Sequence, residues 1–160
     1  MNKPASTIEV SLLPGEVYFG DAPMRVRTLL GSCVAITMWH PQRLVGGMCH
    51  YMLPSRPQPG RQLDGKYAEE AVQLLLREAA RHHTRPQDYQ IKLFGGGSMF
   101  SSYSQPTNIA HSNVNAARML LKRHHLRPSA EDLGRNGHRN VIFDISSGHV
   151  WVRHQDLIES

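Results

Sequence analysis

The stretch LLGSCVAITMWHPQRLVGGMCHYML (residues 29–53) contains two apolar runs joined by four residues that favour a turn. Valine, isoleucine, threonine and tryptophan in the first run are typical of β-strands. A four-residue loop at 40–43 is a common hairpin length, and it places Trp39 opposite Leu44. The pattern therefore predicts an antiparallel β-hairpin.

The same register pairs Cys33 with His50. Directly opposed residues of an antiparallel pair share one face, with Cβ atoms about 4.5–5.5 Å apart. Cys49 belongs to the other face, because neighbours along a strand point to opposite sides. A disulfide between the two cysteines is therefore disfavoured, and both are expected to be free thiols.

A thiol beside an imidazole is the basic arrangement of nucleophilic cysteine catalysis. The thiolate is the nucleophile, and a neighbouring imidazolium lowers the thiol pKa from its free value of about 8.5. Gly31 and Ser32 precede Cys33, so the backbone can turn sharply there and leave N–H groups unpaired near the sulfur. Such N–H groups can bind the negative oxygen of a tetrahedral intermediate.

Other interpretations of these side chains are open at this point. A free cysteine often acts as a small buried hydrophobe, which we expect for Cys49 and which Cys33 could share. A zinc site formed by Cys33, Cys49, His50 and His40 lacks the ligand spacing typical of zinc proteins. A serine triad built on Ser32 lacks an identifiable partner acid.

The length of 160 residues fits a single domain, 1–160, with one substantial core. No apolar run reaches membrane-spanning length, and the N-terminus lacks the apolar core of a secretory signal. We therefore expect a cytoplasmic protein without membrane insertion. The net charge of +5 favours an acidic partner, but the basic residues form no block and no aromatic interleaving. A nucleic-acid module has only this charge in its favour, so no nucleic-acid partner is expected.

The rest of the chain predicts strands at both ends and helices between them. Short β-rich runs come first, at 16–19, 24–29, 34–39 and 44–51. The segment 53–67, rich in proline and glycine, predicts a long mobile loop. Apolar residues at helical spacing predict a first helix within 67–83.

The remaining segments predict a further strand, a second helix and a final hairpin. Residues 89–97 read as a buried strand that enters a glycine turn, and 107–125 as a helix with Asn113 a candidate N-cap. We interpret 126–139 as a connection rich in loops, followed by a hairpin around residues 146–148. This order predicts an α+β fold with a mixed or antiparallel sheet.

Several motifs in the same order resemble the CheD family, the chemoreceptor glutamine deamidases of bacterial and archaeal chemotaxis. The LGSCV element at 30–34 is followed by a histidine in an H-x-MLP context at 50–54. Four later elements also resemble the family: KYAEEAVQLLL (66–76), IKLFGGGSMF (91–100), NIAHSNVNAARMLL (108–121) and DLGRNGHRNVIFDISSGHVWVR (132–153).

The resemblance implies that Cys33 is the nucleophile and His50 the general base and acid. The family also uses a threonine shortly before the cysteine, for which Thr28 is the candidate. The fold it implies is a three-layer α/β/β sandwich, shared with a bacterial toxin deamidase. No cofactor is implied.

The activity implied is hydrolysis of glutamine side chains to glutamate and ammonia on chemoreceptor cytoplasmic domains. A CheC-type phosphatase is an implied further partner. The alternative from another class is a non-catalytic chemotaxis adaptor that binds receptors and such a phosphatase, with ordinary core roles for Cys33 and His50.

Overall fold

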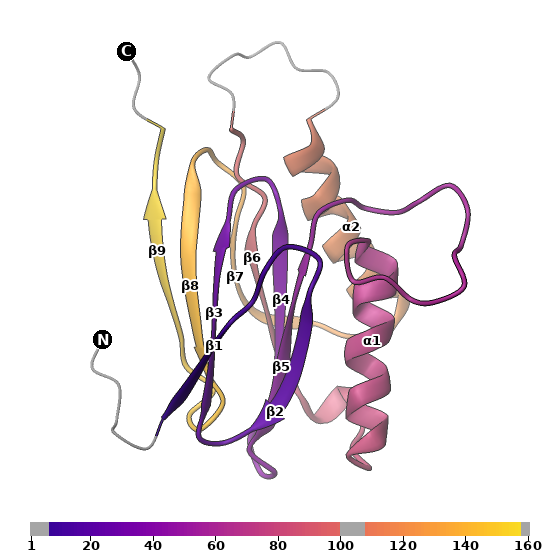
Figure 1. The fold of residues 1–160 in the computed structure, drawn as a ribbon, viewed down its shortest axis with the longest axis vertical. Helices are drawn as coiled ribbons and strands as arrows, with labels where there is room; N and C mark the ends of the chain where they lie inside the picture. Colours follow the sequence, from indigo (N-terminus) through magenta and orange to yellow (C-terminus); the bar gives the residue numbers. More distant parts are fainter. Residues whose placement is uncertain (1–6, 100–107, 158–160) are drawn as a thin grey trace.

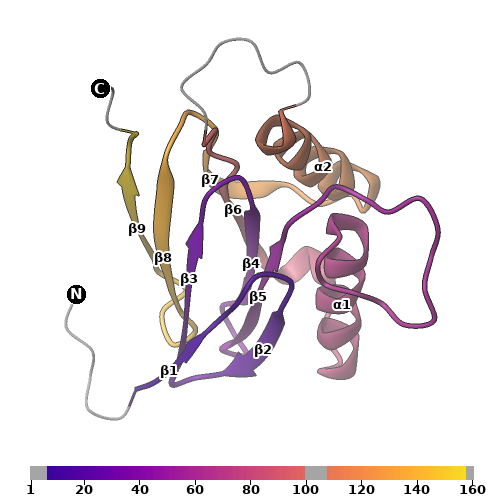
Figure 2. The same ribbon diagram turned by 45° about the horizontal axis from the view of Figure 1, so that its top comes forward.

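The computed structural model describes residues 7–99 and 108–157 of the chain. They form a four-stranded sheet, a five-stranded sheet and two α-helices, stacked as three layers with the five-stranded sheet in the middle (Figure 1; Figure 2). In spatial order the four-stranded sheet contains β1 (Ile8–Ser11), β3 (Met24–Leu30), β8 (His138–Asp144) and β9 (Val150–Gln155). The five-stranded sheet contains β2 (Val17–Asp21), β5 (Val45–Tyr51), β4 (Val34–His40), β6 (Gln90–Gly95) and β7 (Pro128–Leu133). The remaining elements are α1 (Ala68–Arg81), α2 (Ile109–Arg123) and a short 3₁₀ helix, η1 (Pro86–Asp88).

The predicted α+β class and the α/β/β sandwich are thus confirmed, within one domain. The five-stranded sheet is covered on both faces, so β5 is buried along its whole length and β4 almost so. This explains why the two strands are apolar nearly throughout instead of alternating with polar residues.

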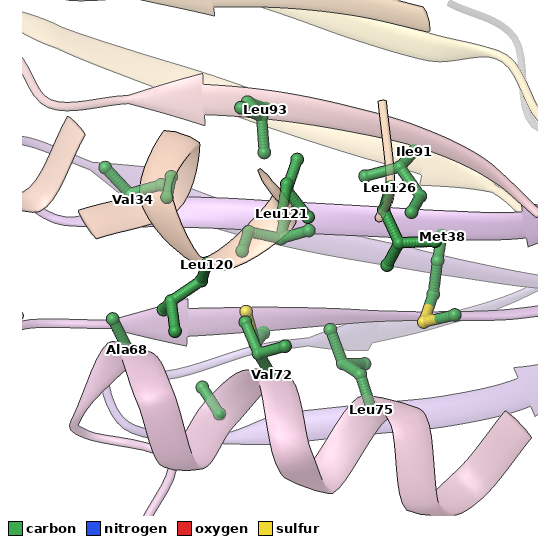
Figure 3. Packing of buried hydrophobic residues seen from close by; sticks show 14 of the residues in the cluster. Val34, Met38, Ala68, Val72, Leu75, Ile91, Leu93, Leu120, Leu121 and Leu126 are labelled. Atoms are coloured by element: carbon green, nitrogen blue, oxygen red, sulfur yellow. The ribbon is translucent and has the colours of Figure 1, made fainter. Parts of the chain in front are cut away.

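Two separate apolar clusters lie on the two faces of this middle sheet. The helix-facing layer, between the sheet and the helices, is drawn in Figure 3. Its members include Val34, Met38, Cys49, Val72, Leu75, Leu93, Leu120 and Leu121. The inter-sheet layer contains Leu12, Val26, Leu30, Ala35, Met48, Phe94, Val141, Phe143 and Ile145.

The hairpin formed by β4 and β5 is confirmed, but its predicted register is wrong by two residues. Trp39 pairs with Gly46 instead of Leu44, and His40 stays in the strand opposite Val45. The turn therefore occupies 41–44, and Leu44 closes it in the left-handed region at φ 51° while its N–H donates to the His40 carbonyl (2.9 Å). Because the shift is an even number of residues, every side chain keeps its predicted face.

Two edge strands, β1 and β7, were not predicted from the sequence. Each pairs in parallel with an inner strand, β1 with β3 and β7 with β6. β7 lies inside the segment 126–139 that was interpreted as a connection, and four of its six residues are exposed. An exposed edge strand lacks the alternation of apolar and polar residues by which a strand is identified.

The predicted helices and the final hairpin are confirmed, with one correction at a helix start. The N-cap of α2 is Asn108, whose side-chain oxygen accepts hydrogen bonds from the N–H groups of Ala110 (3.0 Å) and His111 (3.4 Å). Asn113, the predicted cap, lies within the helix and is fully buried. Among the helices in the described ranges, none is long and apolar enough to span a membrane.

The long connection between β5 and α1 is also confirmed, and one carboxylate holds much of it. Glu70, in the first turn of α1, accepts hydrogen bonds from Arg56 (2.5 and 2.8 Å) and from the N–H of Asp64 (3.0 Å). The loop thereby returns to the helix at two points, eight residues apart along the chain.

Candidate active site

The sequence-predicted site residues gather at one end of the inter-sheet layer. Thr28 lies near the end of β3, and Cys33 directly precedes β4. A short connection joins the two strands (Figure 1). His50 is the next-to-last residue of β5 and pairs with Ala35. Since β5 runs antiparallel to β4, its end meets the beginning of β4 and the end of β3.

Cys33 and His50 are not directly opposite each other, so that part of the sequence prediction is wrong. Cys33 lies one residue before the paired part of the hairpin and two residues before Ala35. Residues two apart along an extended chain share a face. Cys33 packs against the inter-sheet cluster, which is also the side on which His50 contacts Thr28. The thiol and the imidazole thus occupy the same layer in a diagonal arrangement.

A hydrogen bond joins the two buried side chains Thr28 and His50. Thr28 Oγ1 lies 2.6 Å from His50 Nδ1 and donates its own proton to the Leu12 carbonyl (2.8 Å). A hydroxyl has a single proton, so the Thr28 oxygen must accept from Nδ1–H. Arg27, the preceding residue of β3, faces the opposite side and binds Glu9 (2.9 Å).

With its proton on Nδ1, the neutral His50 ring has a lone pair on Nε2. Nε2 is buried and has no hydrogen-bond partner among the described residues. Burial lowers the pKa of His50 to about 4, so the ring is neutral at physiological pH. A neutral imidazole with a free Nε2 can accept a proton from a thiol.

The two cysteines differ in their surroundings. Burial raises the pKa of the half-buried Cys33 thiol, and it raises the pKa of the fully buried Cys49 to about 12. Cys49 lies in the helix-facing layer, on the opposite face of the sheet from Cys33. The predicted separation of the two cysteines is therefore confirmed, and neither forms a disulfide.

The geometry also separates the four side chains of the zinc interpretation. His40 lies at the other end of β4, with its ring edge against Tyr89 at 5.2 Å between ring centroids. Cys49 faces the helices, away from Cys33 and His50. Within residues 7–99 and 108–157, no group of three or more histidine, cysteine or acidic side chains could hold a metal ion.

The connection formed by residues 31–33 is held by its carbonyl groups. The Gly31 carbonyl accepts from Gly97 N–H (2.9 Å) and the Cys33 carbonyl from Gly96 N–H (2.8 Å). Between them, the Ser32 carbonyl accepts from the side-chain amide of Asn113 (3.0 Å). All three carbonyls therefore point toward α2 or toward residues 95–97, which we call the glycine segment.

The N–H groups of this connection point the other way. In a trans peptide the C=O of one residue and the N–H of the next are antiparallel. The N–H of Ser32 consequently faces away from Gly97 and the N–H of Cys33 away from Asn113 of α2, and neither donates a hydrogen bond to a described residue. They are the backbone donors expected near the thiol, now with a defined orientation.

The last residue of β6 and the residue after it have to be glycine, because the backbone there passes close to the Cys33 connection and to α2. Gly95 and Gly96 adopt φ values of 108° and 66°, where other residues are strained. A Cβ at Gly95 would collide with the Cys33 carbonyl oxygen, and one at Gly96 would collide with Val114 of α2. The sequence predicted a glycine turn here without showing that it supports the Cys33 connection.

Arg139 and Asn113 are two further buried residues whose place in the site was missed. Arg139 of β8 is fully buried and donates to the carbonyls of Gly95 (3.2 Å) and Gly134 (2.9 Å), and to Asp132 (3.1 Å). It therefore fixes the glycine segment from the side of the four-stranded sheet. The sequence gives no sign of the contact with Gly95, because the two residues lie forty-four positions apart along the chain.

The fold and the site together define a class: a three-layer α/β/β protein with a thiol and a neutral imidazole at one end of the layer between its sheets. A family described as CheD chemotactic sensory transduction matches residues 52–154. A protein of Pseudomonas syringae pv. tomato named probable chemoreceptor glutamine deamidase CheD is 55% identical over 160 residues, covering 98% of this chain and 95% of the relative. A relative from Chromobacterium violaceum, named probable chemoreceptor glutamine deamidase CheD 1, is 46% identical and covers 94% of this chain and 79% of its own length. The chain belongs to the CheD family.

Proposed function

We propose that this chain is a protein-glutamine deamidase that converts glutamine side chains of chemoreceptors to glutamate with release of ammonia. The observation that supports it best is the Thr28–His50 pair, which leaves Nε2 free on the layer that Cys33 faces. The names of the similar proteins supply the substrate class. We further propose that it acts in the cytoplasm, as one domain spanning residues 1–160.

In the proposed mechanism His50 moves protons and Cys33 forms the covalent bond. Nε2 takes the thiol proton as Sγ attacks the carboxamide carbon of the substrate glutamine. The tetrahedral intermediate collapses as Nε2 returns the proton to the amide nitrogen, and ammonia leaves. A water molecule, deprotonated by Nε2, then attacks the thioester, and the glutamate product departs as the thiol regains its proton.

The other site residues orient this chemistry. Thr28 accepts from Nδ1–H and so keeps the proton off Nε2 between steps. The N–H groups of Ser32 and Cys33 are oriented to stabilise the negative oxygen of the intermediate, and Gly31 allows the turn that exposes them. Because both pKa shifts favour the uncharged forms, the resting pair is a thiol and an imidazole, and the thiolate forms as the substrate is attacked.

The test is mass spectrometry of a receptor cytoplasmic fragment incubated with wild type, Cys33→Ala and Cys49→Ala. We expect the mass change of glutamine to glutamate at specific residues with wild type and with Cys49→Ala, and none with Cys33→Ala. Ammonia should likewise be released with wild type and Cys49→Ala and not with Cys33→Ala. Deamidation by a folded Cys33→Ala protein would refute the proposal.

One observation favours a second candidate, a non-catalytic adaptor that binds receptors and a CheC-type phosphatase. The raised pKa of Cys33 is also what an inert, partly buried thiol would show. For an adaptor, wild type and Cys33→Ala would bind the receptor fragment equally and neither would release ammonia. Measuring binding and ammonia release on the same samples separates the two functions.

A further inference from the structure

Asn113 connects the two chain segments that carry the thiol and the imidazole. Its side-chain NH₂ donates to the carbonyl of Ser32 (3.0 Å) and to the carbonyl of Met52 (2.9 Å). Ser32 immediately precedes Cys33, and Met52 follows His50 by two residues. One amide on α2 therefore spans the gap between the Cys33 connection and the end of β5.

The orientation of this amide is fixed by its partners. Both are carbonyl oxygens, which only accept hydrogen bonds, so the NH₂ group and not the oxygen must face them. The side-chain oxygen Oδ1 is then left buried without a partner among the described residues. Asparagine is also a poor residue for a helix interior. Helix stability alone would favour another residue at this position.

The backbone of Asn113 makes a second connection to the same strand. Its carbonyl accepts a hydrogen bond from the hydroxyl of Tyr51, the residue after His50. Tyr51 is fully buried and belongs to the helix-facing layer. The hydrogen bond from Tyr51 thus fixes α2 against the end of β5 at Asn113 itself. The side chain of the same residue then binds Ser32, so the Cys33 connection is held relative to β5.

We propose that Asn113 is a positioning residue that sets the placement of Cys33 relative to His50; this rests on the proposed function. The Ser32 carbonyl and the Cys33 N–H belong to one peptide unit. Donation to the carbonyl therefore fixes the direction of that N–H and polarises it as a donor. Asn113 is completely buried and donates to the Ser32 carbonyl, so its influence on the thiol passes through the backbone at 32–33.

The test compares Asn113→Asp with Asn115→Asp. The two substitutions are the same and lie two residues apart on one helix, but Asn115 is exposed. Aspartate keeps the volume of Asn113 and replaces its donor by an acceptor, which would face two carbonyl oxygens. We expect the kcat of Asn113→Asp on a receptor fragment to fall by about 100-fold, the order expected for a small displacement of reacting groups, with KM unchanged. Asn115→Asp should match wild type.

A second readout does not depend on deamidation. Alkylation of Cys33 by iodoacetamide at pH 7, followed by mass spectrometry, reports whether His50 still assists the thiol. We expect Asn113→Asp to slow this reaction to the rate of His50→Ala, while Asn115→Asp reacts as wild type does. If wild type deamidates no receptor but this difference is found, the proposed function fails and the positioning role stands.

Asn113→Ala gives an independent variant, because alanine fits any helix and leaves the two carbonyls unpaired. It should show the same losses in a protein that still unfolds cooperatively. Wild-type kcat and alkylation rates in either folded variant would overturn the proposal. So would global unfolding of both variants, since Asn113 would then serve the stability of the fold instead of the placement of Cys33.

Discussion

The two faces of the five-stranded sheet carry one cysteine each, and the surroundings of the two thiols differ. Cys49 lies in the helix-facing layer among aliphatic and aromatic side chains and is completely buried. Cys33 lies at the end of the inter-sheet layer, where Thr28 and His50 bring polar atoms into an otherwise apolar cluster. A sheet covered on both faces can thus use one face for stability and keep chemical groups at the edge of the other.

The largest difference between the two faces should appear in thiol reactivity. Cys49 is inaccessible and has a pKa of about 12, whereas Cys33 is half-exposed. The thiolate is the reacting form, so at pH 8 we expect Cys33 to be alkylated at least about 10³-fold faster than Cys49. Peptide mapping over a time course measures both rates in one sample. Equal rates in the native protein would mean that the two environments are not distinct.

The second prediction concerns the hydrogen bond that fixes the His50 tautomer. Thr28→Val keeps the shape of the side chain and removes the oxygen that accepts from Nδ1–H. Since general-base assistance typically contributes 10²–10⁴-fold, we expect kcat to fall by about 100-fold. Thr28→Ser retains the hydroxyl and should keep most of the activity. Should Thr28→Val be as active as wild type, the orientation of His50 must have another cause.

The third prediction concerns stability as a function of pH, because burial depresses the His50 pKa to about 4. An unfolded histidine has a pKa near 6.5, so between these values the unfolded state binds the additional proton. The neutral form contributes its full stability above pH 6.5, and this contribution is lost as the pH falls from 6.5 to 4. The shift corresponds to about 3 kcal/mol of unfolding free energy.

Urea titrations at pH 4, 5, 6 and 7 measure this loss. His50→Gln cannot titrate and should have a flatter profile over that window, whereas substitution of the exposed His111 by glutamine should retain the wild-type profile. Parallel profiles for wild type and His50→Gln would show that His50 is not the group responsible. The acid limb of the kcat/KM profile should likewise lie near pH 4 instead of near 6.5.

How much of this molecule could be predicted from its sequence follows from where each signal lies. Apolar spacing within 67–83 and a turn between two apolar runs are local signals, so α1 and the existence of the β4–β5 hairpin were predicted correctly, although the register of the hairpin was not. The face of each cysteine also followed, because it depends only on whether the register shift is even or odd. The shift itself could not be predicted, since it depends on the left-handed conformation of Leu44. With Leu44 in the turn, β4 gains His40 and β5 begins at Val45.

The parts that were missed depend on contacts between distant segments. Nothing near Asn113 in the chain indicates that its amide meets Ser32, eighty-one residues earlier in sequence. The same is true of Arg139, which reaches from the four-stranded sheet to Gly95 in the five-stranded sheet. β7 was missed because an exposed edge strand has no apolar face to reveal it. Thr28 entered only through resemblance, and its hydrogen bond to His50 is visible only in three dimensions.

The smallest predicted effect concerns Asn108, which should affect stability alone. Asn108→Ala removes the oxygen that caps the first turn of α2, at a cost of about 1 kcal/mol in unfolding free energy. Unlike Asn113, Asn108 makes no hydrogen bond to the Cys33 connection or to β5 within the described residues, so kcat should remain close to the wild-type value. Urea denaturation and receptor deamidation on the same preparation measure both quantities. Asn115→Ala is the control, because Asn115 is exposed and does not cap the helix. A loss of kcat with Asn108→Ala as large as with Asn113→Ala would mean that the whole helix N-terminus, and not one amide, holds Cys33 in place.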